Sequence, residues 1–222
     1  MKIFNLRGLD FVKSPKLYKG EKMKIGEIKK QSLLLIFPEI EARFDSEDEK
    51  SVSEGIAELK CDPSIRSYLE CSVPAINRAL CEIEKAGATR VKEASVLLNG
   101  SVEDFGNQIP DLYRVLKISQ NGKLISFSQS QGAAFISGAQ SGEAKITYKA
   151  SVPKIRYVTS DSEEIDLDFG VCALIPYFVA GELCEVENEA RAKILREKFF
   201  GGLDYYTQAS ALGSEVEAVY SW

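Results

Sequence analysis

The chain has 222 residues, of which 45% are hydrophobic and 27% charged, and its net charge is −5. This is the composition of a globular protein with one substantial core, and its acidity argues against general affinity for nucleic acids. Histidine is absent, which excludes histidine metal ligands and the Ser-His and Cys-His nucleophile pairs of many hydrolases.

Residues 1–23 form a basic segment without a clean apolar period. Residues 1–30 carry nine Lys and Arg against three Asp and Glu, whereas residues 161–190 carry nine acids and no base. We expect an extended N-terminal arm that lies on its own domain, or alternatively reaches a neighbouring subunit or an acidic surface. Contact with phosphates is less favoured, because the arm lacks the regular aromatic residues of a single-strand binder.

A helical block is predicted over residues 24–87, in about three pieces. The first piece, residues 24–37, carries an apolar stripe that broadens toward its end, and Pro38 stops it. The second piece begins at a capping box, in which Ser46 is the N-cap and Glu49 stands three positions later. Helical spacing of apolar residues continues through both pieces.

The third helix of this block begins at Asp62-Pro63, an N-cap followed by proline at the first helical position. Apolar residues keep helical spacing from there to Gly87, a natural C-terminal cap. Pro74 lies in the middle and removes one helix hydrogen bond. We therefore expect a kink at Pro74, or two helices meeting there.

From Val91 the apolar period changes from that of a helix to that of strands. Asn121-Gly122 lies between two such runs and is a strong signal for a two-residue hairpin. We predict a small antiparallel sheet or sandwich, inserted between helical segments as a β domain over residues 91–164. The predicted strands are residues 91–98, 111–118, 123–127, 133–136 and 144–150, with alternation of apolar and polar residues clearest in 112–118 and 144–149.

Residues 151–167 are predicted to be extended. Helical spacing resumes after them, and Pro176 interrupts it. A further helix is predicted at about 188–200, and Gly201-Gly202 is predicted to break it before a last amphipathic piece at 203–212. The two helical blocks each have one apolar stripe to bury, so the simplest arrangement packs them on each other. The fold class is therefore α+β: a discontinuous helical bundle, residues 24–90 plus 165–222, with the antiparallel β domain inserted.

Five cysteines occur, but no two form a CxxC pair, so the common zinc and thioredoxin-like spacings are missing. The odd count and the lack of a signal-peptide pattern predict reduced thiols in a cytosolic setting. Cys71 and Cys81 point about 80° apart on a helix, since ten residues make about 2.8 turns. Together with Cys61 they are predicted to be small buried hydrophobic residues. No apolar run approaches the ~20 residues of a membrane span.

The best candidate for acid-base or metal chemistry is an acidic cluster at Asp161, Glu163, Glu164, Asp166 and Asp168. The run from Asp166 to Gly170 superficially resembles a calcium loop. It lacks the third alternating oxygen ligand before the glycine and the later glutamate, since position 175 is Ile. A solvated segment that enters a helix is the favoured interpretation. No phosphate-binding or dinucleotide-binding glycine motif occurs, so we predict no catalytic, cofactor-binding or metal-ligating residue and no cofactor.

Three stretches carry a resemblance to a known family. They are SLLLIFPEI at 32–40, DPSIRSYLECSVPAINRALCEIEKAG at 62–87, and IDLDFGVCALIPYFVAGELCEVENEARAKILREKFFGGLD at 165–204. These stretches, and the layout of helices that flank a β insertion, resemble structural proteins of tailed bacteriophages and prophages, in particular the tubular adaptors below the portal of short-tailed phages.

The resemblance implies a non-enzymatic head-to-tail connector. Such proteins form closed homo-oligomeric rings, often twelve-fold, which bind the portal protein on one side and tail proteins on the other. Genomic DNA passes through the channel without sequence-specific binding, and no membrane is involved. The implied location is the bacterial cytoplasm during assembly and then the neck or tail of the virion. The family has no catalytic motif to transfer.

Two other functions stay open from the sequence. The first is a binding module of the tail-tip or baseplate type, in which the β insertion grips a peptide or a glycan. The second is a metal-dependent enzyme that uses the acidic cluster. A deep pocket on the sheet would favour the first, and a metal site built on Asp166 and Asp168 would favour the second.

Overall fold

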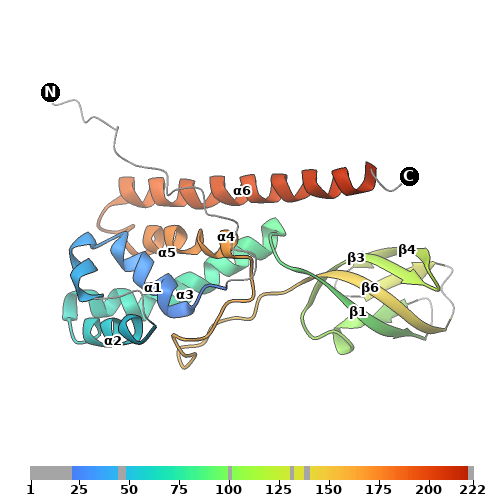
Figure 1. The fold of residues 1–222 in the computed structure, drawn as a ribbon, viewed down its shortest axis with the longest axis horizontal. Coiled ribbons are helices and arrows are strands. Elements are labelled where there is room, and N and C mark those ends of the chain that lie inside the picture. Colours follow the sequence, from blue (N-terminus) through green and yellow to red (C-terminus); the bar gives the residue numbers. More distant parts are fainter. Residues whose placement is uncertain (1–21, 45–48, 100–101, 131–132, 138–140, 220–222) are drawn as a thin grey trace.

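A computed structural model gives the fold of the chain (Figure 1). It describes residues 22–44, 49–99, 102–130, 133–137 and 141–219. Residues 1–21 of the predicted basic arm, and Ser46 of the predicted capping box, lie outside the described residues.

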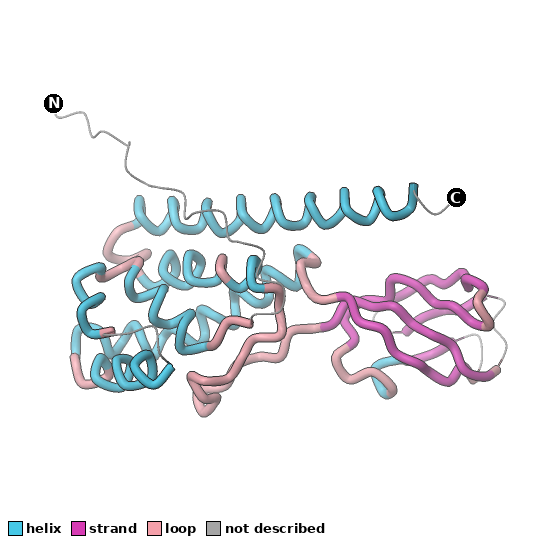
Figure 2. Tube along the Cα trace, viewed as in Figure 1, coloured by secondary structure: helices cyan, strands magenta, loops and turns pink. Residues whose placement is uncertain are grey.

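The molecule consists of a helical unit and a β unit that lie end to end, and one long helix runs along one side (Figures 1 and 2). The fold is α+β, which confirms the predicted class. The helices come from the sequence on both sides of the strands. They are α1 (Ile25–Leu34), the 3-10 helix η1 (Pro38–Arg43), α2 (Glu49–Leu59), α3 (Pro63–Ala86), α4 (Phe169–Cys172), α5 (Ile175–Leu183) and α6 (Glu189–Val219).

The ends of α3 are set by the local signals in its sequence. The Asp62 carboxylate accepts a hydrogen bond from the Ser64 amide at 3.0 Å, as an N-cap does. Gly87 ends the helix in the left-handed conformation, with φ 72°. The helix runs without a break through Pro74. The predicted alternative of two helices meeting at that proline is therefore wrong, because the surrounding packing tolerates the one lost hydrogen bond.

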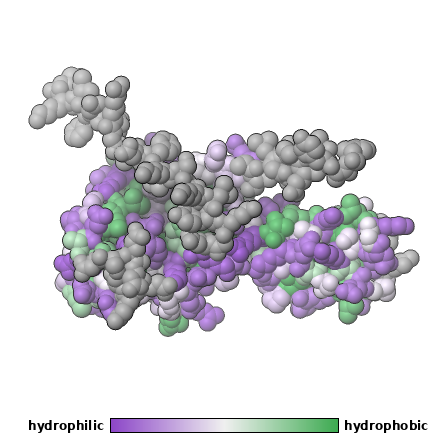
Figure 3. All heavy atoms as spheres, in the orientation of Figure 1, coloured by the Kyte–Doolittle hydropathy of each residue, from purple (hydrophilic) through white to green (hydrophobic). Residues whose placement is uncertain are grey.

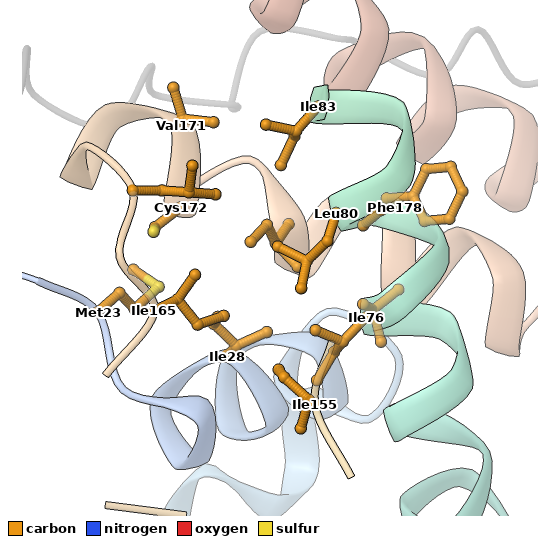
Figure 4. Packing of buried hydrophobic residues seen from close by; sticks show 14 of the residues in the cluster. Met23, Ile28, Ile76, Leu80, Ile83, Ile155, Ile165, Val171, Cys172 and Phe178 are labelled. Atoms are coloured by element: carbon orange, nitrogen blue, oxygen red, sulfur yellow. The ribbon is translucent and has the colours of Figure 1, made fainter. Parts of the chain in front are cut away.

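The core of the helical unit lies where α3 packs on α5 and α6 and where α1 packs on α5. Figure 4 shows Ile76 and Leu80 of α3 pointing toward Ile28 of α1, with Ile155 and Ile165 of two extended segments beside them. All five side chains are buried. Segments that are far apart in the sequence therefore share one core, and the strands are inserted between its halves.

The helical run breaks at residues 173–174, just before Pro176, which had been predicted to interrupt it. The short α4 ends at Cys172, and α5 begins at Ile175. Pro176 thus lies in the first turn of α5, where a missing N–H costs no helix hydrogen bond. At the other end, Arg191 of α6 donates to the carbonyls of Leu35 and Ile36, the latter at 3.3 Å, and so ties α6 to the end of α1.

The predicted break at Gly201-Gly202 is wrong, because α6 is one continuous helix from Glu189 to Val219. The reason is close packing. A Cβ atom at Gly202 would lie 2.5 Å from Cδ2 of Leu174, so the glycine makes room for a neighbouring side chain. Among the described helices, none combines the length and the apolar character needed to cross a membrane.

The β unit is a six-stranded antiparallel sheet with the order β1-β6-β3-β4-β5-β2. The predicted strands all form, and the Asn121-Gly122 hairpin is confirmed, with positive φ at both residues. The three-residue β2 was not predicted. The strands are β1 (Val91–Leu98), β2 (Val102–Asp104), β3 (Leu112–Gln120), β4 (Lys123–Ser130), β5 (Ala133–Ser137) and β6 (Gly142–Ala150), with the 3-10 helix η2 (Phe105–Asn107) after β2.

Strand β3 does not keep the alternation that was predicted for it. Its pairing with β6 shifts twice, between Leu112 and Arg114 and between Val115 and Lys117. Each irregularity adds a residue to one strand, so inward positions recur every third residue instead of every second. As a result Val115 and Ile118 are buried while Leu116 points outward, 41% exposed.

Residues 151–164, which the sequence-based division assigned to the β insertion, lie instead along the helices. The last strand ends at Ala150. Beyond it, the Asn77 amide of α3 donates to the Ile155 carbonyl and accepts from the Ile155 N–H, both at 2.8 Å. Further on, the Ile25 amide donates to the Glu163 carbonyl at 3.0 Å. This segment lacks regular structure, so its sequence gave no sign of the partner on which it lies.

Candidate functional site

The acidic segment at 161–168 is held between the helices and the strands. Asp161 forms a salt bridge with Lys29 of α1 at 2.6 Å, and both side chains are mostly buried. The Gly26 amide donates to the Asp161 carbonyl at 2.8 Å. A Cβ atom at Gly26 would lie 3.0 Å from that carbonyl oxygen, so glycine permits the close approach of the two backbones. This end of the segment is therefore fixed against α1.

Asp166 is the centre of an ion-pair network. Its carboxylate oxygens lie 3.3 Å from Lys22 Nζ, 3.0 Å from an Arg90 guanidinium nitrogen and 3.1 Å from Lys92 Nζ. Arg90 directly precedes β1 and Lys92 lies within it, so Asp166 joins the first strand to the segment that leads into α4.

The network continues into both units. Lys92 also pairs with Asp111 at 2.9 Å, and the Tyr148 hydroxyl of β6 donates to Asp111 at 2.9 Å. On the helical side, the Tyr206 hydroxyl of α6 donates to Asp168. These groups are called the junction cluster below. Its members are Lys22, Arg90, Lys92, Asp111, Tyr148, Asp166, Asp168 and Tyr206.

Hydrogen bonds within the junction cluster favour the charged forms of Asp166, Asp111 and Lys92. Burial alone would raise the pKa of Asp166, but the hydrogen bonds from Lys92 and Lys22 outweigh it, and the pKa is lowered. The hydrogen bond from Lys92 lowers the pKa of Asp111, and the same bond raises the pKa of Lys92. Carboxylates that stay ionised against fixed cations are poor proton carriers near pH 7. These ion pairs hold the segment that leads into α4 against β1.

Asp168 occupies the N-cap position of α4, as a helix-entry residue should, but its side chain makes no capping hydrogen bond. Burial, together with the hydrogen bond to Asp168, raises the pKa of the Tyr206 hydroxyl. The segment leads into α4 with Glu163, Glu164 and Asp168 exposed, as a solvated helix entry does. It has a further role that was not predicted, because cations and a hydroxyl from distant elements bind Asp161, Asp166 and Asp168. Within the described residues, no group of three or more Cys, Asp and Glu is placed to hold a metal ion.

Two of the cysteines predicted to be buried are exposed. Cys61 follows α2, and Cys71 lies on the face of α3 opposite its buried residues. Cys172 and Cys184 are buried, and burial raises the pKa of the Cys172 thiol to about 12. Such a thiol is an inert packing group rather than a nucleophile. All five thiols are free.

A cleft of about 890 Å³ lies beside the junction cluster, and Thr89, Arg90, Asp168 and Tyr206 are among the residues that line it. Lys149 of β6 reaches its rim and donates to the carbonyl of Gly87, which satisfies the C-terminus of α3. Burial and the nearby Arg114 lower the pKa of Lys149. Of the side chains at this cleft, Arg90 and Lys149 each form a contact between the β unit and the helical unit.

Sequence reasoning missed the basic and hydroxyl members of the junction cluster. Arg90, Lys92 and Asp111 are isolated charges in or beside strands, and Tyr206 lies in a helix with ordinary spacing. No local pattern marks such residues as partners of Asp166 or Asp168. The one available signal was the unusual acidity of 161–168 itself, which correctly marked one side of the contact.

No protein-family model matches the chain, and a search of curated proteins found no significant match.

Proposed function

We propose that the protein is a non-enzymatic structural component of a tailed bacteriophage or prophage, a ring-forming connector between the portal and the tail. The observation that carries the proposal is the projection of α6 beyond the helices on which it packs. Among the residues of α6 whose side chains the structure describes, Leu203 is the last in the main core, and Tyr206 bonds to Asp168 of the junction cluster.

From Thr207 to Val219 the helix continues for roughly 20 Å, at 1.5 Å per residue. Figure 1 shows this part extending past α5 and over the β unit. This end continues a helix whose first turns already pack on α5, so it does not need a nucleus of its own. A projecting helical end is expected in a subunit that packs against other chains.

The junction cluster supports the same function. A closed ring requires every subunit to present its surfaces at one fixed angle, since a heterologous contact that does not close produces filaments. The ion pairs of Asp166 with Arg90 and Lys92 set the β unit against the segment that leads into the helices. The relative position of the two units is thus defined by specific contacts as well as by chain connections.

In this proposal the partners are other copies of the chain in a ring, of twelve subunits by family resemblance, with the portal protein above and tail proteins below. Genomic DNA passes through the channel without base-specific contact, which a net acidic protein allows. Assembly takes place in the bacterial cytoplasm, and the finished ring belongs to the virion neck.

Co-expression with the portal protein of the same genome tests the proposal. The full chain is expected to sediment with the portal ring. A variant that ends after Gln208 keeps Tyr206 but removes the projecting end of α6, so it is expected to retain its thermal stability within a few degrees and to bind the portal at least tenfold more weakly. A chain that stays monomeric at high concentration and never co-sediments with the portal would contradict the proposal.

A further inference from the structure

A rigid turn projects from the helical unit between the last strand and the acidic segment. Ile155 anchors it in the core, and the Asn77 side chain holds both backbone groups of that residue at 2.8 Å. The turn closes with two bonds between Arg156 and Thr159: the Thr159 amide donates to the Arg156 carbonyl at 3.0 Å, and the Arg156 amide donates to the Thr159 hydroxyl at 2.9 Å.

This basic turn, residues 154–158, presents two large apolar side chains to solvent. Tyr157 is 71% exposed and Val158 is 90% exposed. Lys154 and Arg156 flank them, and neither forms an ion pair with a residue that the structure describes. Figures 1 and 2 show the turn projecting on the side of the helical unit away from α6. Apolar groups on a fixed projection, bordered by unpaired cations, are typical of a contact that inserts into a partner.

A groove of opposite charge lies at the start of α6. Ala192 and Phe200 form its apolar part, and Glu185, Glu189 and Glu197 border it. Phe200 is 42% exposed although its ring also stacks on Phe178 and Phe199. We call this surface the α6 groove.

The α5–α6 turn forms one end of the α6 groove and is itself well ordered. The amides of Glu187 and Asn188 donate to the Cys184 carbonyl at 3.2 and 2.8 Å. Between two glutamates at its tip, Val186 is 98% exposed. The turn therefore offers an apolar group with acids on both sides, the counterpart of the basic turn.

The acids of the groove are only partly neutralised within the chain. Glu185 pairs with Arg196, and Glu182 pairs with Arg78 at 2.7 Å. Glu189 and Glu197 form no ion pair with the part of the chain that is described. Lys193 is the other cation of the groove. When Glu187 of the adjoining turn is counted with the groove, its acids outnumber its cations, so the surface is acidic.

We propose that the basic turn of one copy docks in the α6 groove of the next copy. Tyr157 and Val158 would pack against Phe200, Ala192 and Val186, and Arg156 would pair with Glu189 or Glu197. The two surfaces lie on different sides of the helical unit in Figure 1, so one copy cannot satisfy both within itself. When the turn of each copy enters the groove of the next copy along, the contact is heterologous, and such contacts generate a ring if the rotation closes. This inference rests on the proposed ring-forming function.

Photo-crosslinking tests the contact directly. The full chain carries p-benzoylphenylalanine in place of Val158, and equal amounts of the normal and the ¹⁵N-labelled protein are mixed at concentrations where oligomers form, or on the portal ring. Irradiation is expected to join position 158 to residues 185–200 of a differently labelled copy. The matched control places the same photoreactive residue at Leu124, which is 71% exposed at the β3–β4 hairpin, and is expected to give no crosslink to 185–200.

Charge reversal gives a second readout. Arg156→Glu and Glu189→Arg are each expected to weaken self-association at least fivefold in sedimentation velocity, and the double variant is expected to recover most of the loss. Lys123→Glu, at the same hairpin as Leu124, is the control for net charge and is expected to change little. Arg156 and Glu189 are both exposed, and unchanged thermal melting would show that their variants fold.

The outcomes separate this inference from the function on which it rests. Rings that form while position 158 crosslinks elsewhere, or to DNA only, would overturn the docking proposal and leave the ring function standing. The absence of any oligomer and of any portal complex would overturn both. Crosslinks to 185–200 within one label only would place the contact inside a single copy and would also overturn the docking proposal.

Discussion

The chain contains two acidic segments of similar composition and different use. In residues 161–168, Ile165 and Leu167 are buried, Asp161 pairs with Lys29 of α1, and Asp166 pairs with Lys92 of β1. In residues 182–189, Val186 stands fully in solvent between two glutamates. Acidity alone does not distinguish the two. The alternation of apolar and acidic residues in the first segment allows one face to enter the core while the other pairs with bases.

The largest expected effect comes from the buried residue of the first segment. Leu167 is 0% exposed, so Leu167→Ala is expected to lower the free energy of unfolding by about 2–5 kcal/mol, from lost transfer energy and a cavity. Val186→Ala, its counterpart in the second segment, is expected to change it by less than about 0.5 kcal/mol. Urea denaturation of the two variants measures both values. Equal losses would mean that the two segments do not differ as described.

The next effect concerns the carboxylates. Asp166→Asn removes the carboxylate charge that forms ion pairs with Lys22, Arg90 and Lys92. The three cations then lose this ion-pair partner. Because the Asp166 side chain is 35% exposed and its ion pairs are partly screened, the expected loss is roughly 1–2 kcal/mol.

Glu189→Gln is the matched control in the second segment, and its effect on unfolding is expected to stay within about 0.5 kcal/mol. The same denaturation experiment compares the pair. A loss at Glu189 that equals the loss at Asp166 would contradict an internal role for the first segment and an external role for the second.

The pH dependence of stability gives a smaller and more specific signal. The pKa of Asp166 is lowered by folding, so the unfolded state binds its proton at a higher pH than the folded state does. Its stabilising contribution is therefore complete above about pH 4, the ordinary range for aspartate, and is lost as the pH falls through the folded pKa.

The difference in unfolding free energy between the wild type and Asp166→Asn should accordingly stay constant from pH 7 to about pH 5 and shrink below pH 4. Denaturation at four pH values in that range measures it. A difference that does not change down to pH 3 would show that Asp166 stabilises the fold by its shape and not by its charge.

Local signals in the sequence were enough for most elements of the fold. Asp62-Pro63 and Gly87 mark the two ends of α3, and Asn121-Gly122 marks the β3–β4 hairpin. These residues act through their own backbone geometry, so the chain needs no distant partner to express them. The α+β class followed from the same signals.

Features that depend on distant contacts could not be predicted. Gly202 serves the packing of Leu174 rather than a helix end, and the bulges of β3 are set by its pairing with β6. The junction cluster likewise depends on which charges the fold brings beside Asp166. Only Asp166 and Asp168 of that cluster lie in an acidic stretch of the sequence, so only these two were singled out as candidate site residues.

The central claim is that the chain assembles into closed rings at the head-to-tail junction. Electron microscopy of the full chain, alone at high concentration and bound to the portal ring, tests this claim most directly. The expected result is closed rings of a single symmetry, with the rotational axis aligned to that of the portal. Isolated monomers at every concentration, with no added density on the portal, would contradict it.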